Sequence, residues 1–159
     1  MDVAGFLKSL TDSPDYAGQI AHVHTEPARE AHWADLPGGM RPEVEKFIAA
    51  RGVSKLYRHQ AEAVQALLEG KDVLITTSAA SGKSLCYQLP VLNTMLNRPE
   101  STGLFLFPAK ALARDQAAAW NQGLSALGSI AEEDGMRAIP FDGDAGKADR
   151  RTARESGRL

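Results

Sequence analysis

The first forty residues alternate between short apolar patterns and turn-forming segments. Residues 3–10 place their apolar side chains on one side of a predicted helix, and residues 20–24 alternate as a strand does. The segments around them are rich in Pro, Gly, Asp and Ser, which favour turns. We therefore predict a mostly helical and irregular N-terminal extension over residues 1–41.

From residue 42 the apolar positions follow helical spacing. Pro42 begins a predicted helix that ends near Ala50, because proline is favoured in the first helical turn. A second predicted helix covers residues 58–69, and Gly70 ends it.

Farther along, short apolar runs alternate with helical patterns. The runs over 72–77, 103–107 and 137–141 are typical of buried strands. Predicted helices follow each of them, from residue 82, over 109–126 and over 147–155. This alternation predicts an α/β fold, a parallel sheet with helices on both faces and ligands at the carboxyl ends of its strands. Pro90 leaves two possibilities open for the helix from residue 82, a kink or an end near Leu89.

The segment between the first strand and its helix has the spacing of a phosphate-binding loop. A strand before it and a helix after it are the context that such a loop requires. Its backbone amides and the helix N-terminus favour a phosphate, Lys83 would reach the β- and γ-phosphates, and Ser84 would bind Mg²⁺. Thr77 departs from the usual Gly, and a turn that happens to read Ser-Gly-Lys-Ser is the alternative. The candidate nucleotide-binding residues are Thr77, Ser78, Ala79, Ala80, Ser81, Gly82, Lys83 and Ser84.

Composition and charge narrow the partners. A chain of 159 residues with net charge −2 fits one ordinary domain and carries no overall positive charge that would indicate nucleic-acid binding. Residues 147–158 hold five basic side chains against two acids, which suits either a solvated helix face or a local basic patch. The single cysteine, Cys86, excludes an internal disulfide and favours the cytoplasm, and we expect it to be a buried, inert thiol. The N-terminus does not have the pattern of a signal peptide, and no apolar run is long enough to span a membrane.

Three sequence blocks resemble known motifs. LYRHQ over 56–60, TTSAASGKSLCYQLPVL over 76–92 and LFLFPAKALARDQ over 104–116 resemble motifs Q, I and Ia of superfamily 2 DEAD/DEAH-box helicases. The branch of mitomycin-repair helicases is the most similar, and the resemblance extends from about residue 20 to the end. It implies a RecA-like P-loop fold in which residues 42–159 form an incomplete first lobe. It also implies use of ATP and Mg²⁺, and a role in DNA repair.

The resemblance further implies roles for single residues. Gln60 would read the adenine edge, since an amide offers both donors and an acceptor; an exposed helical glutamine is the alternative. Lys110 and Pro108, at a helix start, would contact a nucleic-acid phosphate. Arg114 lies further along that helix, and Gly143 matches a loop that lies along the DNA backbone in the family. Ordinary helix capping is the alternative there. The expected partner is single-stranded or tailed DNA. Tyr57 is assigned to the core, and Trp33 and Trp120 to packing.

The family's second ATP motif, an apolar strand ending in Asp-Glu-x-His, does not occur in these 159 residues. Glu132, Glu133 and Asp134 follow no β-branched run and are assigned to a solvated loop. The second helicase lobe is missing as well. We therefore expect weak MgATP binding without strand separation. The alternatives are another P-loop enzyme, such as a small-molecule kinase, or a non-enzymatic module that binds nucleotide or nucleic acid.

Overall fold

A computed structural model describes residues 2–28, 30–143 and 145–155, apart from the side chain of Asp149. The chain divides into two compact units, of which the first ends at Glu30 and the second begins at Ala31. The first unit contains α1 (Val3–Thr11), where the Asp2 carboxylate accepts a hydrogen bond from the Gly5 amide at 2.9 Å. The predicted helix over 3–10 is thus confirmed. The strand predicted over 20–24 is wrong: these residues are irregular, because no neighbouring strand among the described residues pairs with them.

The second unit is mainly helical. Its helices are α2 (Pro42–Ala49), α3 (Arg58–Leu68), α4 (Lys83–Asn97), α5 (Lys110–Ser125), α6 (Ser129–Glu133) and α7 (Lys147–Glu155). The helices predicted from the pattern are confirmed, and α4 continues through Pro90, so an end near Leu89 is wrong. Glu132 and Glu133 lie in α6 and not in a loop, because Ala131 beside them is buried and anchors this turn of helix. None of the described helices has the length and apolar character needed to cross a bilayer.

Two short strands join the start of the second unit to α3. β1 (Trp33–Ala34) pairs antiparallel with β2 (Leu56–Tyr57), with Trp33 opposite Tyr57. The Arg58 amide also donates to the His32 carbonyl at 2.8 Å. Residues just before α2 are thereby held beside the N-terminus of α3.

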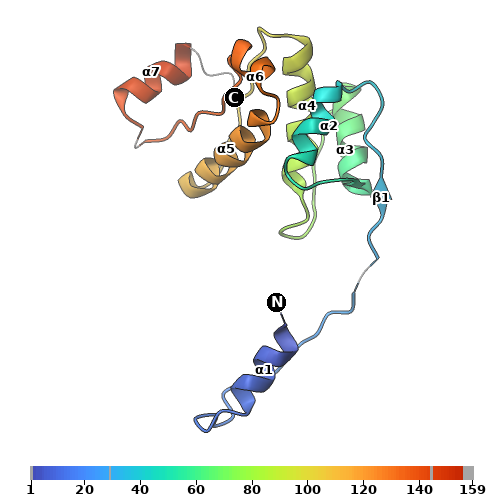
Figure 1. The fold of residues 1–159 in the computed structure, drawn as a ribbon, viewed down its shortest axis with the longest axis vertical. Helices are drawn as coiled ribbons and strands as arrows, with labels where there is room; N and C mark the ends of the chain where they lie inside the picture. Colours follow the sequence, from blue (N-terminus) through green and yellow to red (C-terminus); the bar gives the residue numbers. More distant parts are fainter. Residues whose placement is uncertain (1, 29, 144, 156–159) are drawn as a thin grey trace. The chain divides into compact units, whose positions relative to one another are not determined.

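The core lies where α2, α3, α4 and α5 meet, and α3 and α4 lie side by side (Figure 1). Phe47 of α2 is fully buried, and its ring centroid lies 5.3 Å from that of Trp120 on α5. Trp120 is 1% exposed, which confirms its packing role. Leu89 and Leu92 of α4 fill the space beneath them. Burying each large apolar side chain contributes about 1.5–3 kcal/mol, so this helical cluster holds the unit together.

The three predicted strands do not form a sheet in this structure. In the described part of the chain, no backbone hydrogen bond joins 72–77, 103–107 or 137–141 to a neighbouring strand. The side chains of one segment nevertheless alternate: in 103–107, Phe105 and Phe107 are partly buried, whereas Leu104 and Leu106 are 84% and 85% exposed. The strand periodicity is present and the backbone partners are not, so the parallel sheet stays a prediction.

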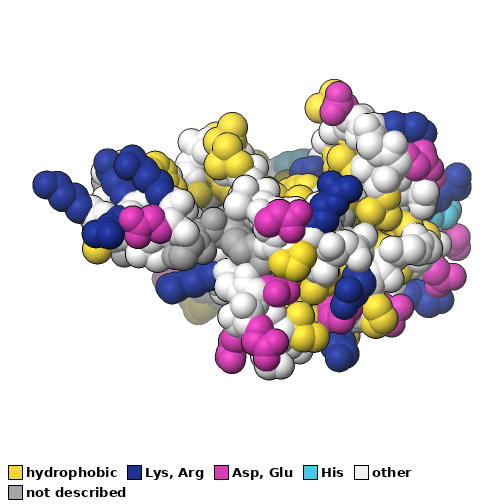
Figure 2. All heavy atoms as spheres, turned by 90° about the horizontal axis from the view of Figure 1, so that it is seen from above, with side chains coloured by type: hydrophobic (Ala, Val, Ile, Leu, Met, Phe, Trp, Pro, Cys, Tyr) yellow, Lys and Arg dark blue, Asp and Glu magenta, His cyan; other side chains and the backbone are white. Residues whose placement is uncertain are grey.

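Charge is unevenly distributed over the surface of the second unit. Dark blue Lys and Arg side chains gather over α7, at the left of Figure 2. The sequence of α7, KADRRTARE, accounts for this concentration.

Candidate nucleotide and nucleic-acid sites

The predicted phosphate-binding loop makes a tight turn directly before α4. Ala80 has φ 58° and Gly82 has φ 77°, so both lie in the left-handed region that residues with a side chain rarely adopt. Gly82 is the residue immediately before the first turn of α4. The amides of that turn lack acceptors within the helix, which makes its N-terminus suitable for an anion.

Lys83 lies across the loop. Its ammonium group donates to the Thr77 carbonyl at 2.9 Å and to the Ser78 carbonyl at 2.5 Å. The hydroxyls of Thr77 and Ser81 lie 2.6 Å apart and close the same turn. The loop is thus held by its own lysine.

Gln60 fastens the start of α3 to the loop. Its side-chain oxygen accepts from the Tyr57 amide at 2.8 Å, and its side-chain nitrogen donates to the Gly82 carbonyl at 2.9 Å. His59 adds a second contact, with Nε2 3.2 Å from the Ser81 carbonyl. Gln60 is 2% exposed, so the alternative of an exposed helical glutamine is wrong. Each polar atom of its amide keeps one further hydrogen-bonding position.

Three aromatic rings stack beside this contact. The centroids of Trp33 and Tyr57 lie 4.7 Å apart with an interplanar angle of 13°, and Tyr57 lies 5.8 Å from His59 at 12°. Trp33 is 55% exposed and Tyr57 38%, so the assignment of Tyr57 to the core is wrong. The strand β2 explains this: Leu56 faces the core, so the next side chain faces outward. The stack presents aromatic surface close to the loop.

A polar network ties the loop's helix to α5. The Tyr87 hydroxyl donates to Oε1 of Gln116 at 3.0 Å, and Nε2 of Gln88 lies 3.5 Å from the same oxygen. Arg51 donates to Gln88 from the end of α2, and burial lowers the pKa of this guanidinium. In α4, burial raises the pKa of the Cys86 thiol, in agreement with its prediction as inert. Tyr87 and Gln88 of the same helix thus both contact α5 through Gln116.

The predicted nucleic-acid residues lie at the start of α5. Arg114 forms an ion pair with Asp142 at 2.9 Å, which brings the 142–143 turn to α5. A Cβ atom at Gly143 would lie 3.8 Å from Nζ of Lys110. Lys110, Arg114 and Gly143 are thus brought together, and Pro108 is exposed just before them and lines the same hollow as Lys110.

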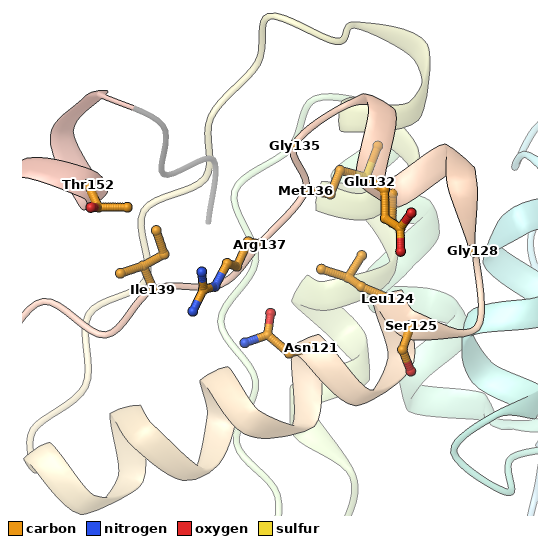
Figure 3. A pocket seen from close by; sticks show the side chains of 11 residues that line it. Asn121, Leu124, Ser125, Gly128, Glu132, Gly135, Met136, Arg137, Ile139 and Thr152 are labelled. Atoms are coloured by element: carbon orange, nitrogen blue, oxygen red, sulfur yellow. The ribbon is translucent and has the colours of Figure 1, made fainter. Parts of the chain in front are cut away.

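A larger hollow lies at the other end of α5 (Figure 3). Its volume is about 720 Å³, and its lining includes Asn121, Leu124 and Met136. Asn121 holds the adjoining segment, because its amide exchanges hydrogen bonds with the backbone of Ala138 at 2.9 and 3.1 Å. None of the predicted site residues lines this hollow, so its size has no bearing on the nucleotide site.

Comparison with known proteins shows which family this chain is similar to. The sequence profile of the family described as DEAD/DEAH box helicase matches residues 57–151. The ATP-dependent helicase HRQ1 of Saccharomyces cerevisiae is 38% identical over 153 residues, which is 96% of this chain and 14% of that protein. The uncharacterized ATP-dependent helicase YprA of Bacillus subtilis is 33% identical over 155 residues, covering 96% of this chain and 20% of that protein.

Solved structures that are similar to this chain also belong to a helicase. A crystal structure of the helicase MrfA bound to DNA matches with a TM-score of 0.74 and 34% identity, covering 82% of this chain and 18% of that chain. A second, bound to DNA and AMPPNP, matches with a TM-score of 0.67 and 36% identity over the same shares. These likenesses support a RecA-like α/β fold for this chain, which spans about a fifth or less of each of these relatives.

Proposed function

Because the chain belongs to the DEAD/DEAH box helicase family, we propose that it is the part of an ATP-dependent DNA helicase that grips nucleotide and touches nucleic acid. Members similar to it are named ATP-dependent helicases. The observation that carries the proposal is the bond from Gln60 to the Gly82 carbonyl, which joins the predicted base-reading residue to the phosphate loop. In a small-molecule kinase, the alternative P-loop enzyme, the block over 56–60 that contains Gln60 would have no such role.

In the proposed complex, Lys83 leaves the carbonyls of Thr77 and Ser78 and pairs with the β- and γ-phosphates. Backbone amides over residues 77–84 surround the phosphate chain. The hydroxyl of Ser84 would hold Mg²⁺, and the bound ion would neutralise phosphate charge. The residues fit this ligand because the left-handed backbone at Gly82 carries no side chain and the first amides of α4 lack acceptors within the helix.

The adenine would be recognised beside Gln60. Its free hydrogen-bonding positions suit the donor and acceptor on the base edge. The exposed stack of Trp33 and Tyr57 offers an aromatic face on which the base can lie. Both features support an adenine nucleotide over phosphate alone.

Nucleic acid would lie along the start of α5. Pro108 and the first amides of α5 would receive a phosphate, and Lys110, Arg114 and Gly143 would line its path. The solved MrfA structure that is described as bound to DNA supports DNA as the partner. We propose, in addition, that this DNA is single-stranded or tailed and that the protein acts in DNA repair. We further propose residues 42–159 as an incomplete first lobe that follows an extension over 1–41.

The chain is expected to bind ATP without hydrolysing it. Phosphoryl transfer needs the metal, the lysine and a water-orienting group together, and no Asp-Glu-x-His stands in these residues to orient water. Phosphate release with oligo(dT) present should therefore not exceed the blank. ATP turnover that the variant Lys83→Ala abolishes would contradict this expectation.

The proposed nucleic-acid contact is tested by a separate variant. Lys110→Ala should weaken oligo(dT) binding by about three- to tenfold, because a charged contact to phosphate is lost. An unchanged affinity for oligo(dT) would contradict this contact.

A further inference from the structure

All four cations of α7 lie on one face of the helix. Lys147, Arg150, Arg151 and Arg154 follow the spacing i, i+3, i+4, i+7, which places side chains one above another. Together with Glu155 they surround a hollow of about 250 Å³. In a chain whose net charge is −2, this is a local concentration of positive charge, and Figure 2 shows it at the surface.

Most of this charge is not used to hold the fold. Arg150 is the exception, since its guanidinium donates to the Gly143 carbonyl at 3.0 Å and fixes the turn against α7. Arg151 pairs with Glu155 at 2.9 Å, but both side chains are more than 60% exposed, so the pair contributes little. Lys147 and Arg154 are exposed and make no hydrogen bond or ion pair with another described residue.

An exposed aromatic ring connects α7 with α5. Phe141 is 56% exposed, and the guanidinium carbons of Arg150 and Arg154 lie 6.0 and 5.9 Å from its centroid. The next residue, Asp142, is paired with Arg114 of α5. The basic start of α5, the ring of Phe141 and the basic face of α7 therefore form one continuous surface.

We propose that this surface is a second contact for single-stranded nucleic acid, beyond the residues at the start of α5. Phosphates bind Lys147, Arg151 and Arg154, because arginine forks match phosphate oxygens and lysine adds point charge. A base stacks on Phe141, since every base has a π face and the contact tolerates any sequence. An acidic peptide would use the cations but would gain nothing specific from the ring. The inference rests on the proposed nucleic-acid function and adds Phe141 and α7 to it.

The test measures fluorescence anisotropy of labelled oligo(dT) with the whole chain over a range of salt. Each phosphate contact contributes about −0.7 to the slope of log affinity against log salt for single strands, so K147Q/R154Q should make the slope shallower by about 1.4. The charge-matched control is K55Q/R98Q, two exposed cations that line neither of the hollows along this surface, which should leave the slope unchanged. An unchanged slope in K147Q/R154Q overturns the phosphate contact.

The ring is tested separately because it carries no charge. Phe141→Leu should weaken binding by at least about fivefold at constant slope, whereas Phe141→Tyr keeps the π face and should bind as the unaltered chain does. Circular dichroism verifies that both variants keep their helices. Equal affinity of the Leu variant overturns the stacking contact, as does polyglutamate competing as well as oligo(dT) of equal charge.

The outcomes also separate this inference from the proposed function. If Lys110→Ala loses affinity while the α7 and Phe141 variants bind normally, the α7 contact is wrong and the proposed function stands. If the unaltered chain binds no oligo(dT) at any salt, both are wrong.

Discussion

Gly82 is the residue on which the geometry of the nucleotide site depends. Its φ of 77° favours glycine, and a Cβ atom there would lie 2.3 Å from the side-chain nitrogen of Gln60. Any larger residue must therefore push Gln60 away from the loop, which breaks the bond between them. Gly82 thus connects the backbone shape of the loop to the position of the Gln60 amide, for which we propose the role of reading the base.

Gly82→Ala should lower MgATP affinity by at least about tenfold, the equivalent of one charged or buried hydrogen bond. Titration with a fluorescent ATP analogue measures this. Gly39→Ala is the matched control, because Gly39 has a similar φ of 82° but open space around it. If both variants bind nucleotide equally well, the Gln60 contact has no part in binding.

The turn before α4 could be predicted because its signal is local, and nucleotide binding by Lys83 and Ser84 stays a prediction. Both residues stand in a short string with a strand pattern before it and a helix after it. Trp33 could not be found this way, since its contact with Tyr57 depends on β1 pairing with β2, two segments far apart in the chain. No pattern around Trp33 indicates that pairing.

At the scale of elements, the backbone of α5 lies against Phe47 of α2 at Gly123. A Cβ atom at this position would lie 2.3 Å from Cε2 of Phe47, a ring that is fully buried. The close approach of the two helices therefore requires glycine, although glycine weakens a helix.

Gly123→Ala should destabilise the chain by about 1–3 kcal/mol, because overpacking a fixed ring outweighs the gain of about 1 kcal/mol in helix propensity. Urea unfolding followed by circular dichroism measures the change. Adding Phe47→Leu should recover part of the loss, since the clash is then removed. A net gain in stability for Gly123→Ala alone would show that the helices can separate without cost.

Helices can be predicted from a local pattern more readily than strands, because only a strand needs a partner segment for its backbone hydrogen bonds. A helix satisfies its backbone within the segment, so the apolar spacing over 58–69 suffices to predict α3 to within one residue of its observed end. A strand needs a partner, and the alternation over 103–107 predicts only which side chains share a face. That alternation is present, with Leu104 and Leu106 on the exposed side.

At the scale of the whole molecule, these unpaired segments leave apolar surface exposed to solvent. Leu74 is 90% exposed, and the segment over 103–109 borders a hollow of about 480 Å³ that Trp120 also lines. Unpaired apolar strand segments are templates for pairing with other chains. The chain by itself should therefore associate at high concentration.

Replacing Leu104 with Lys and Leu106 with Glu should reduce this association without lowering the melting temperature, because neither side chain packs in the core. Light scattering over a concentration series measures it. The control is Phe105→Ser, which removes the ring that packs on Tyr87 and Trp120 and should lower the melting temperature. Scattering equal to that of the unaltered chain would mean that another surface drives association.

The second compact unit begins at Ala31, ahead of the first helix of the predicted lobe. The β1–β2 pair accounts for this, because it holds residues 33–34 against the start of α3. The division into an extension over 1–41 and a lobe from residue 42 stays a prediction. Family membership, in contrast, was predictable from the motif blocks, since their order and spacing are carried by the sequence itself.

Calorimetric titration of the chain with MgATP tests the central claim, that residues 77–84 hold a triphosphate. We predict a saturable heat for the unaltered chain and a loss of at least about tenfold in affinity for Lys83→Ala, because a charged contact to phosphate is removed. Unfolding measurements on both proteins would show that the variant is folded. No heat with the unaltered chain, or equal heat with Lys83→Ala, would contradict the account.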